Sequence, residues 1–379
     1  MARKVVHLTT VHPPYDTRIF EKECRTLAEA GYEVVLVVPA EADAERAGVR
    51  VRAVPLPRSR RERATRTAWR VYKAALAERG DVYHYHDPEL MPIGLLLRLR
   101  GKRVVYDAHE KVAAQVSYKD WIPRVLRKPV SWAVRAVEAV NARVVTRVVA
   151  AWPAIAAQFR PRDVVLVRNF PRLEEFTAVE PTPYLDRAPV VAYVGGLTPE
   201  RGAREMFRAI DLVPADLGAR LVIGGTFYPE SLDEDAKKAG PRVERLGWLK
   251  RPEVARLLGS ARMGLVLFQP APNHLESEPN KLFEYMAAGL PVVASDFPNF
   301  RGVVESTRCG ILVDPTDPAA IAGAIERLLR DPKEAEAMGA RGAAAVRAKY
   351  HWGPEGAKLL ALYEELLAKA GHGPATPHR

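Results

Sequence analysis

Residues 276–296 read ESEPNKLFEYMAAGLPVVASD, and they predict a loop, a short helix, a glycine stop and a buried strand. Pro279 suits the first helical turn, because a proline at that position loses no intrahelical hydrogen bond. The apolar face that follows at helical spacing consists of Leu282, Phe283, Met286 and Ala287. Gly289 ends the helix, and the apolar run 291–295 (PVVAS) predicts a short buried strand.

Three polar residues of this stretch are harder to explain by packing. Glu276 precedes the helix and Glu284 lies within it, while Asn280 shares a helix face with Glu284. The unpaired N–H groups and the positive dipole end of a helix N-terminus favour the binding of a phosphate. The residues alone leave two interpretations open. One is a diphosphate site flanked by carboxylates that accept hydrogen bonds from sugar hydroxyls, and the other is an amphipathic helix with ordinary surface glutamates.

The whole string resembles the donor-site signature of the retaining glycosyltransferases of family 4, which have the GT-B fold. In that family the first Glu of the E-x7-E motif, here Glu276, contacts hydroxyls of the donor sugar. The second, here Glu284, contacts the nucleotide ribose. The resemblance implies an α/β protein in which two Rossmann-like domains face each other across a cleft and a C-terminal helix returns to the first domain. It also implies transfer with retention of anomeric configuration and no required metal.

The front half of the chain has the alternating pattern of a parallel α/β sheet. Valine-rich apolar runs such as 4–9 and 32–39 alternate with helical stretches, which indicates βαβ units. Polar groups in such sheets gather at the carboxyl ends of the strands. We therefore expect the segments 12–18, 84–89 and 107–110 to lie along one rim.

Histidines mark each of these rim segments, and a histidine at a strand end is more often structural than catalytic. The sequence YDAHE resembles the family's strand end whose His contacts the donor sugar, which makes His109 a candidate catalytic residue. The first rim loop departs from the Gly-Gly pattern common in the family, and in the family this loop usually touches the acceptor. The candidates for the acceptor side are His12, Tyr15, Asp16, Arg18 and His86.

A second α/β unit begins at PVVAYVGGLTPERG, residues 189–202, where a glycine pair follows a buried strand. By resemblance this segment carries an Arg and a Lys on the diphosphate, but here Gly196 stands at the Arg position and Arg201 at the Lys position. Arg201, Lys281 or both must then compensate. The candidate catalytic residues are His109, Glu276, Arg201 and Lys281. The candidate nucleotide-binding residues are Gly195, Gly196, Arg201, Gly247, Trp248, Leu249, Asn280, Lys281 and Glu284, of which 247–249 match the family loop that meets the base.

The segment 164–176 looks like a crossing between domains. We expect an acceptor-side domain of residues 1–168 plus 353–379 and a donor-binding domain of residues 169–352. The terminal helix over 350–370 is expected to pack on the first domain, and the tail from residue 371 onward is expected to be disordered.

The net charge of +11 is unevenly distributed: residues 1–168 carry 31 Lys and Arg against 18 Asp and Glu, and the rest is near neutral. This predicts a polyanionic partner or an anionic membrane surface for the front half, although a GC-rich genome or heat adaptation would also enrich arginine.

The basic helical stretches 58–79 and 119–143 contain Trp69, Trp121 and Trp132. They are either membrane-contacting surfaces or solvated faces with core tryptophans. Nucleic-acid binding is not expected, because no recognised module accompanies the charge.

Composition indicates a globular protein with room for two domains. The two distant cysteines, Cys24 and Cys309, and the lack of a long apolar run predict a reduced cytoplasmic protein, at most at the inner face of the membrane.

The expected function is transfer of a sugar from a UDP- or GDP-sugar to a lipid-linked, polysaccharide or small-molecule acceptor, with no cofactor besides the donor. The alternatives are a nucleotide-sugar 2-epimerase of the same fold and a non-enzymatic basic binding protein. A dehydrogenase is poorly supported, since no G-x-G-x-x-G follows the first strand.

Overall fold

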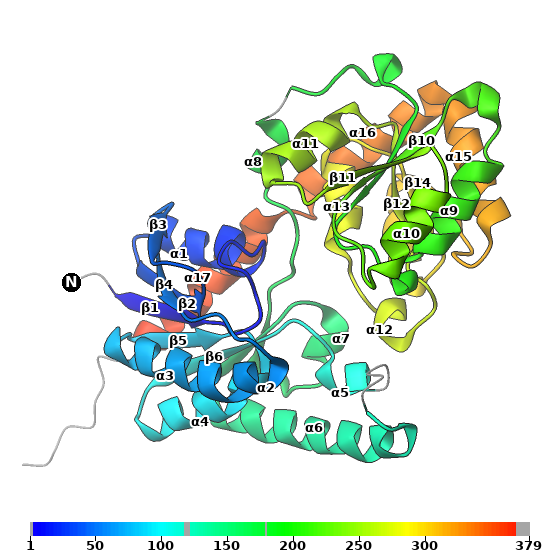
Figure 1. Ribbon diagram of the computed structural model, residues 1–379. Helices are drawn as coiled ribbons and strands as arrows, with labels where there is room; N and C mark the ends of the chain where they lie inside the picture. Colours follow the sequence, from blue (N-terminus) through cyan, green and yellow to red (C-terminus); the bar gives the residue numbers. More distant parts are fainter. Residues whose placement is uncertain (1–2, 117–121, 179, 369–379) are drawn as a thin grey trace, which may run out of the picture. The chain divides into compact units, whose positions relative to one another are not determined.

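The computed structural model describes residues 3–116, 122–178 and 180–368. The chain forms two compact units: unit 1 comprises Met1–Asn169 and Gly353–Arg379, and unit 2 comprises Phe170–Trp352 (Figure 1). Each unit has its own sheet and its own buried apolar core. The two units are therefore separate α/β domains, and the chain passes from one to the other inside the segment that the sequence marks as a crossing.

Within the described residues, unit 1 is built on an eight-stranded sheet in the order β3-β4-β2-β1-β5-β6-β7-β8. Its strands are β1 (Lys4–Leu8), β2 (Glu33–Pro39), β3 (Ala44–Arg46), β4 (Val49–Val54), β5 (Val82–Tyr85), β6 (Arg103–Ala108), β7 (Arg147–Ala150) and β8 (Val164–Leu166). All neighbouring strands are parallel except β3 and β4. The strand order reverses between β1 and β5, which makes this point the topological switch of a doubly wound fold.

The β3 strand is a feature that the sequence does not predict. It pairs antiparallel with β4 through a tight turn in which Ala47 and Gly48 have φ values of 50° and 74°. Such a turn requires positive φ at both central residues, and alanine adopts that conformation rarely. An Ala-Gly pair is therefore a weak hairpin signal. The strand β8 also lies inside the predicted crossing, so the chain adds one more strand before it leaves unit 1.

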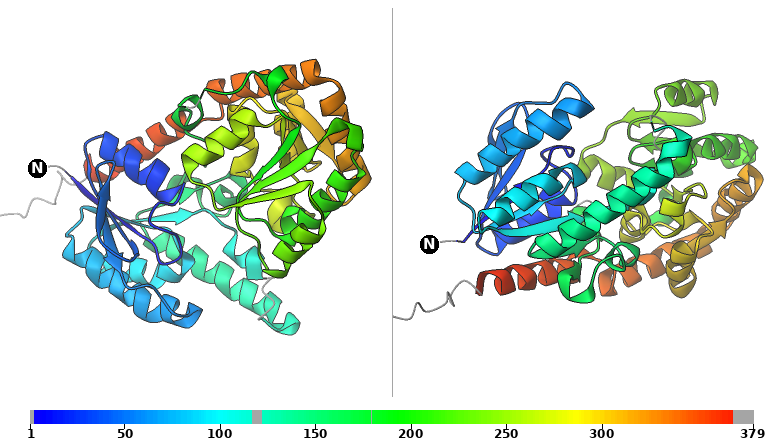
Figure 2. Two further views of the ribbon diagram at one scale, coloured as in Figure 1. Left: turned by 45° about the horizontal axis from the view of Figure 1, so that its top comes forward. Right: turned by 90° about the horizontal axis from the view of Figure 1, so that it is seen from below.

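Helices cover both faces of this sheet. The longer ones are α3 (Ala68–Ala77), α4 (Met91–Leu99), α6 (Arg124–Val144) and α17 (Trp352–Ala368). The shorter ones are η1 (Ile19–Cys24), α1 (Arg25–Glu29), α2 (Arg60–Glu62), η2 (Arg63–Thr67), η3 (Pro88–Leu90), α5 (Val112–Gln115), α7 (Pro153–Ala156) and η5 (Pro161–Asp163). As expected from the sequence, α17 (red in Figure 2) packs on unit 1, where the Tyr363 hydroxyl lies 2.9 Å from His84 Nδ1.

The helical segment that follows the first rim loop is divided into two parts. Its first part, η1, is a π-helical turn, and the α-helix α1 follows it. The wider turn directs all six of its residues inward, including the charged residues Glu21, Lys22 and Glu23. Single π turns of this kind are frequent at functional sites.

Unit 2 contains, in its described part, a six-stranded parallel sheet in the order β11-β10-β9-β12-β13-β14. Its strands are β9 (Val190–Val194), β10 (Arg220–Gly224), β11 (Val243–Gly247), β12 (Met263–Val266), β13 (Val292–Ser295) and β14 (Gly310–Val313). Alternate residues of β9 point to opposite faces: Val191 and Tyr193 join one apolar cluster, and Ala192 and Val194 join the other. Both faces are thus covered, as parallel sheets require.

The helices of unit 2 lie on the two sides of this sheet (Figure 2). They are α8 (Glu174–Thr177), α9 (Ala203–Leu212), α10 (Ser231–Lys238), α11 (Arg251–Ser260), α12 (Pro272–Leu275), α13 (Asn280–Ala287), α14 (Pro298–Thr307), α15 (Pro318–Arg330) and α16 (Pro332–Ala348), with the turns η6 (Tyr184–Asp186), η7 (Pro199–Arg201) and η8 (Ala215–Leu217). The predicted central helix is α13, with Pro279 at its N-cap rather than inside its first turn. Gly289 follows the helix in the left-handed region (φ 71°), which confirms the predicted glycine stop.

Two tryptophans of the basic helical stretches are exposed. The exposed fractions of Trp69 and Trp132 are 47% and 78%, so the interpretation in which these rings belong to the core is wrong for both. Trp121 and the tail expected to be disordered lie outside the described residues. No helix in the described parts of the chain combines the length and the apolar character needed to cross a bilayer.

Candidate active site

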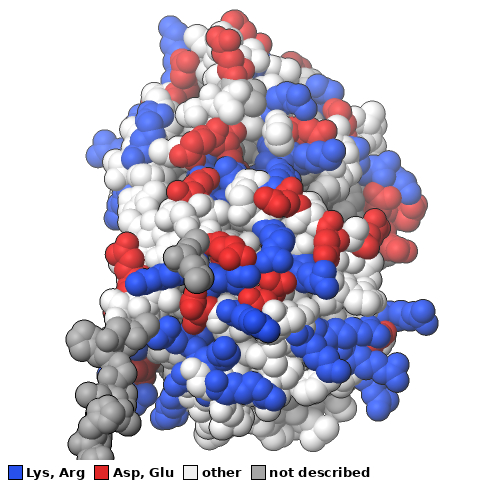
Figure 3. All heavy atoms as spheres, turned by 90° about the vertical axis from the view of Figure 1, so that its left-hand side faces the viewer, with Lys and Arg blue, Asp and Glu red and all other residues white. Residues whose placement is uncertain are grey.

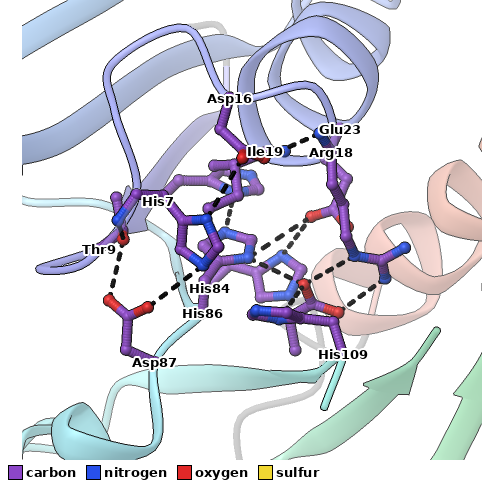
Figure 4. A network of polar contacts seen from close by, with 12 residues as sticks. His7, Thr9, Asp16, Arg18, Ile19, Glu23, His84, His86, Asp87 and His109 are labelled. Carbon is purple, nitrogen blue, oxygen red and sulfur yellow. Dashed lines mark hydrogen bonds and ion pairs between the residues drawn. The ribbon is translucent and has the colours of Figure 1, made fainter. Parts of the chain in front are cut away.

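The first set of candidate residues surrounds the topological switch of unit 1. There β1 and β5 are neighbours, and His7 stands opposite His84 in the register. Loops after β1, β5 and β6 bring His12, His86 and His109 to one edge of the sheet, and the rings of His12 and His109 meet edge to face at 5.1 Å. The three rim loops predicted from the sequence therefore lie together (Figure 4).

The carboxylate of Asp107 is the hub of this network. It accepts hydrogen bonds from Arg18 Nε at 2.9 Å and from Arg18 Nη2 at 2.7 Å, and it lies 3.0 Å from His86 Nδ1 and 3.3 Å from His109 Nδ1. Burial alone would raise the pKa of Asp107, but the charge and hydrogen bonds of Arg18 hold that pKa well below its ordinary value. Asp107 is therefore a carboxylate that orients two imidazoles.

Two residues expected on the acceptor side are buried beneath the rim instead. The exposed fraction of Arg18 is 5%, and its guanidinium is engaged by Asp107, by Glu23 and by the backbone carbonyl of Val167. His86 is fully buried. Direct contact with an acceptor does not fit this burial, so Arg18 and His86 support the rim by holding Asp107.

His109 is the rim histidine held by this hub. Its Nδ1 faces Asp107, which leaves Nε2 available to a ligand. Burial lowers the pKa of His109, but the hydrogen bond and charge of Asp107 outweigh burial and raise that pKa above its ordinary value. The side chain retains some exposure, as a residue that contacts a substrate must.

His12, Asp16 and Tyr15 form the outer part of the rim. His12 Nδ1 lies 3.2 Å from Asp16, and His12 Nε2 lies 3.5 Å from Asp87. Burial lowers the pKa of His12, but the hydrogen bond and charge of Asp16, with the charge of Asp87, raise it to about 9. The Tyr15 ring is exposed and packs against Phe20. These side chains are accessible, unlike Arg18 and His86.

The raised pKa of His12 predicts a pH-dependent stability. His12 titrates at about 9 in the folded protein and at about 6.5 when unfolded, so its ion pair stabilises the fold fully below pH 6.5. That contribution, about 2 kcal/mol after discounting for partial exposure, is lost as the pH rises through 9. Urea unfolding of the wild type and of His12→Asn should show a free-energy difference that shrinks between pH 6.5 and 9.5. A constant difference over this range would contradict the assignment.

The second set of candidate residues surrounds the topological switch of unit 2, between β9 and β12. Gly195 and Gly196 follow β9, and Gly195 has φ 108°. A Cβ on Gly225 would lie 2.0 Å from the Gly195 carbonyl oxygen, so the loops after β9 and β10 touch backbone to backbone. This close approach requires glycine at Gly225, and the positive φ favours glycine at Gly195, so the glycine pair leaves the backbone after β9 without side chains.

Two cations flank this glycine loop. Arg201 ends η7, and its Nη1 donates a 2.6 Å hydrogen bond to the Gly196 carbonyl. A Cβ on Gly196 would lie 3.3 Å from that same nitrogen. The Arg201 head group therefore occupies the space beside Gly196, where the family has an arginine side chain.

Lys281 is the other cation, on the first turn of α13. Its Nζ donates to the Tyr193 hydroxyl at 2.7 Å, lies 3.8 Å from the centroid of the Tyr193 ring, and would be 3.7 Å from a Cβ on Gly195. Burial, and then the nearby charge of Arg201, hold the pKa of Lys281 well below its ordinary value. Pro279, at the N-cap of α13, has no side-chain oxygen with which to cap the helix. The glycine loop, the two cations and the start of α13 thus form one electropositive set of groups.

The two glutamates of the E-x7-E motif lie in different surroundings. Glu276 follows α12, is exposed, and its carbonyl oxygen accepts from the Asn299 amide at 2.6 Å. Glu284 is buried on α13 and accepts a 2.8 Å hydrogen bond from Arg251 Nη2. Arg251 also pairs with Glu175. Arg251 was not predicted as a site residue, because nothing in its local sequence pattern distinguishes it from a surface arginine at a helix start.

The predicted base-contacting loop lies at the end of β11. Gly247 ends the strand, Trp248 is 70% exposed, and the side chain of Leu249 packs on Gly224. Gly247 also lines a hollow of about 740 Å³ together with Gly225 and Thr226. Asn280, the first residue of α13, is partly exposed beside Lys281. The predicted nucleotide-binding residues therefore gather at the carboxyl ends of the unit 2 strands.

Comparisons with known proteins identify related families over both units. Residues 17–171 match the family described as "Glycosyl transferase 4-like domain", and residues 188–331 match "Glycosyl transferases group 1". The chain is 31% identical over 202 residues to the D-inositol 3-phosphate glycosyltransferase of Corynebacterium urealyticum, covering 50% of this chain and 46% of that protein. It is 38% identical over 127 residues to the phosphatidyl-myo-inositol mannosyltransferase of Mycobacterium leprae, covering 34% and 33%. The aligned regions thus span less than half of each of these relatives.

Solved structures match over nearly the whole chain. The sucrose-phosphate synthase of Thermosynechococcus elongatus superimposes with a TM-score of 0.77 at 20% identity, covering 97% of this chain and 100% of that one. Anabaena HepE, solved in complex with UDP and glucose, superimposes with a TM-score of 0.74 at 15% identity, covering 96% and 100%. At these identities the likeness establishes the GT-B fold, as the sequence predicts.

Proposed function

Since the chain belongs to the family 4-type glycosyltransferases, we propose that it transfers a sugar from a UDP- or GDP-sugar to an acceptor. The observation that carries this proposal is the electropositive set of groups around the glycine loop of unit 2, with the Arg201 and Lys281 side chains beside it. In a doubly wound fold, a ligand binds at the carboxyl ends of the strands beside the topological switch, and these groups stand there.

The proposed ligand of these groups is the diphosphate of the donor. The bare backbone at Gly195 and Gly196 lets a phosphate approach closely, and Lys281, on the first turn of α13, brings its amino group to the same loop. Gly196 stands where the family has an arginine. The Arg201 guanidinium is proposed to take the role of that arginine, because its head group lies beside Gly196. Its planar fork suits two phosphate oxygens.

The nucleoside half of the donor is assigned to the neighbouring loops. The Glu284 carboxylate is proposed to accept hydrogen bonds from the ribose hydroxyls while the hydrogen bond from Arg251 holds it in place. The exposed Trp248 and the backbone around Leu249 are proposed to meet the base. UDP in the HepE complex supports uracil as one candidate base, and the relatives whose names include GDP-mannose support guanine as the other.

The reaction itself is proposed to retain the anomeric configuration and to need no catalytic metal. Positive charge develops on the sugar as the diphosphate leaves, and preorganised cations stabilise the leaving group most in the transition state. Arg201 and Lys281 supply these cations. The Glu276 carboxylate and His109 Nε2 would orient the sugar hydroxyls, and the leaving phosphate would take the proton of the attacking hydroxyl.

The acceptor is proposed to be phosphorylated or lipid-linked. Curated relatives act on inositol 3-phosphate and on phosphatidyl-myo-inositol, and another solved neighbour was crystallised with glucose 6-phosphate. Such acceptors carry negative charge, and unit 1 is the basic part of the chain. His12, whose raised pKa keeps it cationic at neutral pH, and the exposed Tyr15 are the proposed contacts.

The test of this function is a transfer assay. The protein is incubated with UDP- and GDP-sugars and a panel of inositol phosphates, sugar phosphates and phosphatidylinositol vesicles, and released nucleoside diphosphate is measured. We expect release that depends on one donor and one acceptor class, persists in EDTA, and gives a product with the donor's anomeric configuration by NMR. Conversion of the donor without any acceptor would favour a 2-epimerase, and no release with any pair would refute the proposal.

We also propose that unit 1 contacts an anionic membrane through α6. The exposed apolar side chains of this helix are Val125, Leu126, Trp132, Val137 and Val140. They form a stripe beside the basic residues Arg124, Arg127, Lys128 and Arg135. Figure 3 shows, over the lower part of one face, basic side chains with few acidic ones among them. An apolar stripe flanked by cations is the pattern of a helix that lies in a lipid interface.

Vesicle sedimentation at low salt tests this contact. We expect binding to vesicles with about one third anionic lipid and little binding to neutral vesicles, since each cation near an anionic surface contributes about 1 kcal/mol. Trp132→Ala should reduce the bound fraction severalfold. Leu99→Ala, which removes an equally exposed apolar side chain from α4, should leave it unchanged. Equal binding of all three proteins, or no binding of the wild type, would contradict the proposal.

A further inference from the structure

Beneath the rim of unit 1 lies a cluster of four buried metal-ligating side chains. His7, His84, His86 and Glu23 are each fully buried, and one potential ligand atom of each lies within 4.8 Å of those of the other three. The imidazole centroids are 4.7 to 5.1 Å apart. Figure 4 shows these side chains converging from different elements. The cluster is separate from the accessible rim residues to which the proposed function assigns the acceptor.

Rigid elements hold the cluster in place. His7 and His84 stand opposite each other on the paired strands β1 and β5, and His86 follows directly after β5. Glu23 comes from η1, the π-helical turn that directs its charged residues inward. A site whose ligands come from strands and a helix is held more tightly than one built on loops.

Several polar atoms of the cluster are not satisfied by their neighbours, although His7 Nδ1 and His86 Nε2 lie within hydrogen-bond distance of each other at 2.9 Å. Among the described residues, neither carboxylate oxygen of Glu23 has a hydrogen-bond partner, and His84 Nε2 has none. Arg18 is the cation beside Glu23, and its Nε lies 3.1 Å from Glu23 Oε1. The same guanidinium also donates two hydrogen bonds to Asp107. One buried guanidinium thus faces two buried carboxylates. A buried polar group without a partner is costly and needs an explanation such as an ion.

We propose that His7, His84, His86 and Glu23 bind one divalent first-row transition metal ion, with zinc as the preferred ion. Three imidazoles and one carboxylate match the nitrogen and oxygen ligands that zinc takes in closed four-coordinate sites. The dication supplies the positive charge that the pair of buried carboxylates lacks. The ligand atoms close around it by small side-chain rotations, since zinc bonds of about 2.0 to 2.2 Å are shorter than the present separations allow.

The surroundings of the cluster resemble the outer shell of a metal site. His86 Nδ1 lies 3.0 Å from the Asp107 carboxylate, so its Nε2 can ligate while the carboxylate fixes the tautomer. The Tyr363 hydroxyl of α17 lies 2.9 Å from His84 Nδ1 and 3.4 Å from His7 Nε2. Burial keeps the pKa values of His7 and His84 well below the ordinary value, so both rings are neutral, as ligands must be.

The site is structural in character. Full burial leaves no position for a substrate, and the ligands tie β1, β5 and η1 together while Tyr363 links them to α17. The metal is therefore expected to enter during folding and to stabilise unit 1. Because transfer of the sugar does not pass through it, failure of this proposal and failure of the proposed function are separate results.

The competing explanation is a metal-free network. Burial and the charge of Asp107 raise the pKa of Glu23 well above its ordinary value, so a protonated Glu23 could share its proton with one of the imidazoles. In that case the four side chains need no ion. The two explanations differ in metal content and in the effect of replacing Glu23 by glutamine, which keeps the shape and removes the charge.

The experiment uses the full chain without an affinity tag, expressed in medium supplemented with zinc or cobalt. We measure metal content by plasma mass spectrometry, the visible absorption of the cobalt form, and the melting temperature before and after unfolding, chelation and refolding. The variants are Glu23→Gln and His84→Asn, with two controls. His274→Asn removes a histidine of unit 2, and Leu99→Ala changes an exposed side chain of unit 1 outside the cluster.

We expect about one metal ion per chain in the wild type and in both controls, the d–d bands of tetrahedral cobalt, and a melting temperature several degrees lower after chelation and refolding. Glu23→Gln and His84→Asn should lose the ion and its absorption bands. Wild-type protein without metal, or metal content unchanged in Glu23→Gln and His84→Asn, would overturn the proposal. If both ligand variants fail to fold, metal-free refolded wild type of unchanged melting temperature would overturn it equally.

Discussion

Replacing Glu276 by glutamine is expected to lower turnover by about 100- to 1,000-fold while leaving the affinity for UDP or GDP within about twofold of the wild type. The carboxylate is exposed after α12 and stands apart from the buried Glu284, so it is positioned for the sugar rather than for the nucleoside. The hydrogen bonds that the charged carboxylate accepts from the sugar hydroxyls become stronger as positive charge develops on the sugar ring. Initial rates and calorimetric titration with the nucleoside diphosphate give the two quantities.

Glu305→Gln is the matched control for this change. Glu305 is also exposed, on α14, and it forms an ion pair with Arg301 at 3.2 Å. Its replacement should leave both turnover and nucleotide affinity unchanged. Full activity of Glu276→Gln, or an equal loss of nucleotide affinity and turnover, would show that Glu276 does not act on the sugar.

Replacing Lys281 by methionine is expected to weaken nucleoside diphosphate binding at least about tenfold and to lower turnover by about 100-fold or more. The change removes the buried ammonium beside the glycine loop and keeps the length of the side chain. The fold should tolerate it, because desolvation already disfavours the charge at this position. The affinity for the nucleoside without phosphates should stay as it is.

The low pKa of Lys281 gives this prediction a second readout. In the free protein, burial and Arg201 hold that pKa well below its ordinary value, whereas a bound diphosphate favours the ammonium form. Binding should therefore take up protons between the lowered pKa of Lys281 in the free protein and its higher pKa in the complex, and the affinity should fall as the pH rises through this range. Calorimetry in buffers of different ionisation enthalpy measures the uptake.

The control for Lys281 is Lys333→Met on the exposed surface of α16. Proton uptake should persist in that control and disappear in Lys281→Met. Equal uptake and equal affinity in the wild type and Lys281→Met would mean that the diphosphate does not bind beside α13.

The elements around the proposed donor site could be predicted because each has a strong local signal. Pro279, the apolar spacing of α13 and Gly289 define a helix, and the positive φ of Gly289 has a direct steric cause. The valine runs of the parallel strands are equally legible. The hairpin at Ala47 was not, since an alanine in a left-handed conformation is set by its tertiary context.

Local sequence patterns carried no information about which residues contact the site residues. Arg18 was expected to face an acceptor, but it is buried because Asp107, far away in the sequence, needs a buried cation. The pairing of Glu284 with Arg251 and that of His84 with Tyr363 depend in the same way on contacts between distant segments. Such contacts follow from the strand order, which brings separate loops to one edge.

The replacement of a family arginine by Gly196 shows what the sequence could predict and what only the structure could add. The sequence indicated that Arg201 or Lys281 compensates for the missing side chain. The structure adds that the Arg201 head group lies beside Gly196 and donates to its carbonyl, while the Lys281 amino group lies beside Gly195. The compensation proposed from the sequence therefore has a geometry that mutation of either cation can test.

The binding of a nucleoside diphosphate is the most direct test of the account. The melting temperature is measured with UDP, GDP, ADP, NAD and a short RNA, each at the same series of concentrations. One of UDP and GDP should stabilise the protein, since a ligand at about 100 times its dissociation constant adds about 2.7 kcal/mol to the free energy of unfolding. The other ligands should have little effect. Stabilisation by RNA or NAD alone, or by no nucleoside diphosphate at any concentration, would contradict the donor site in unit 2.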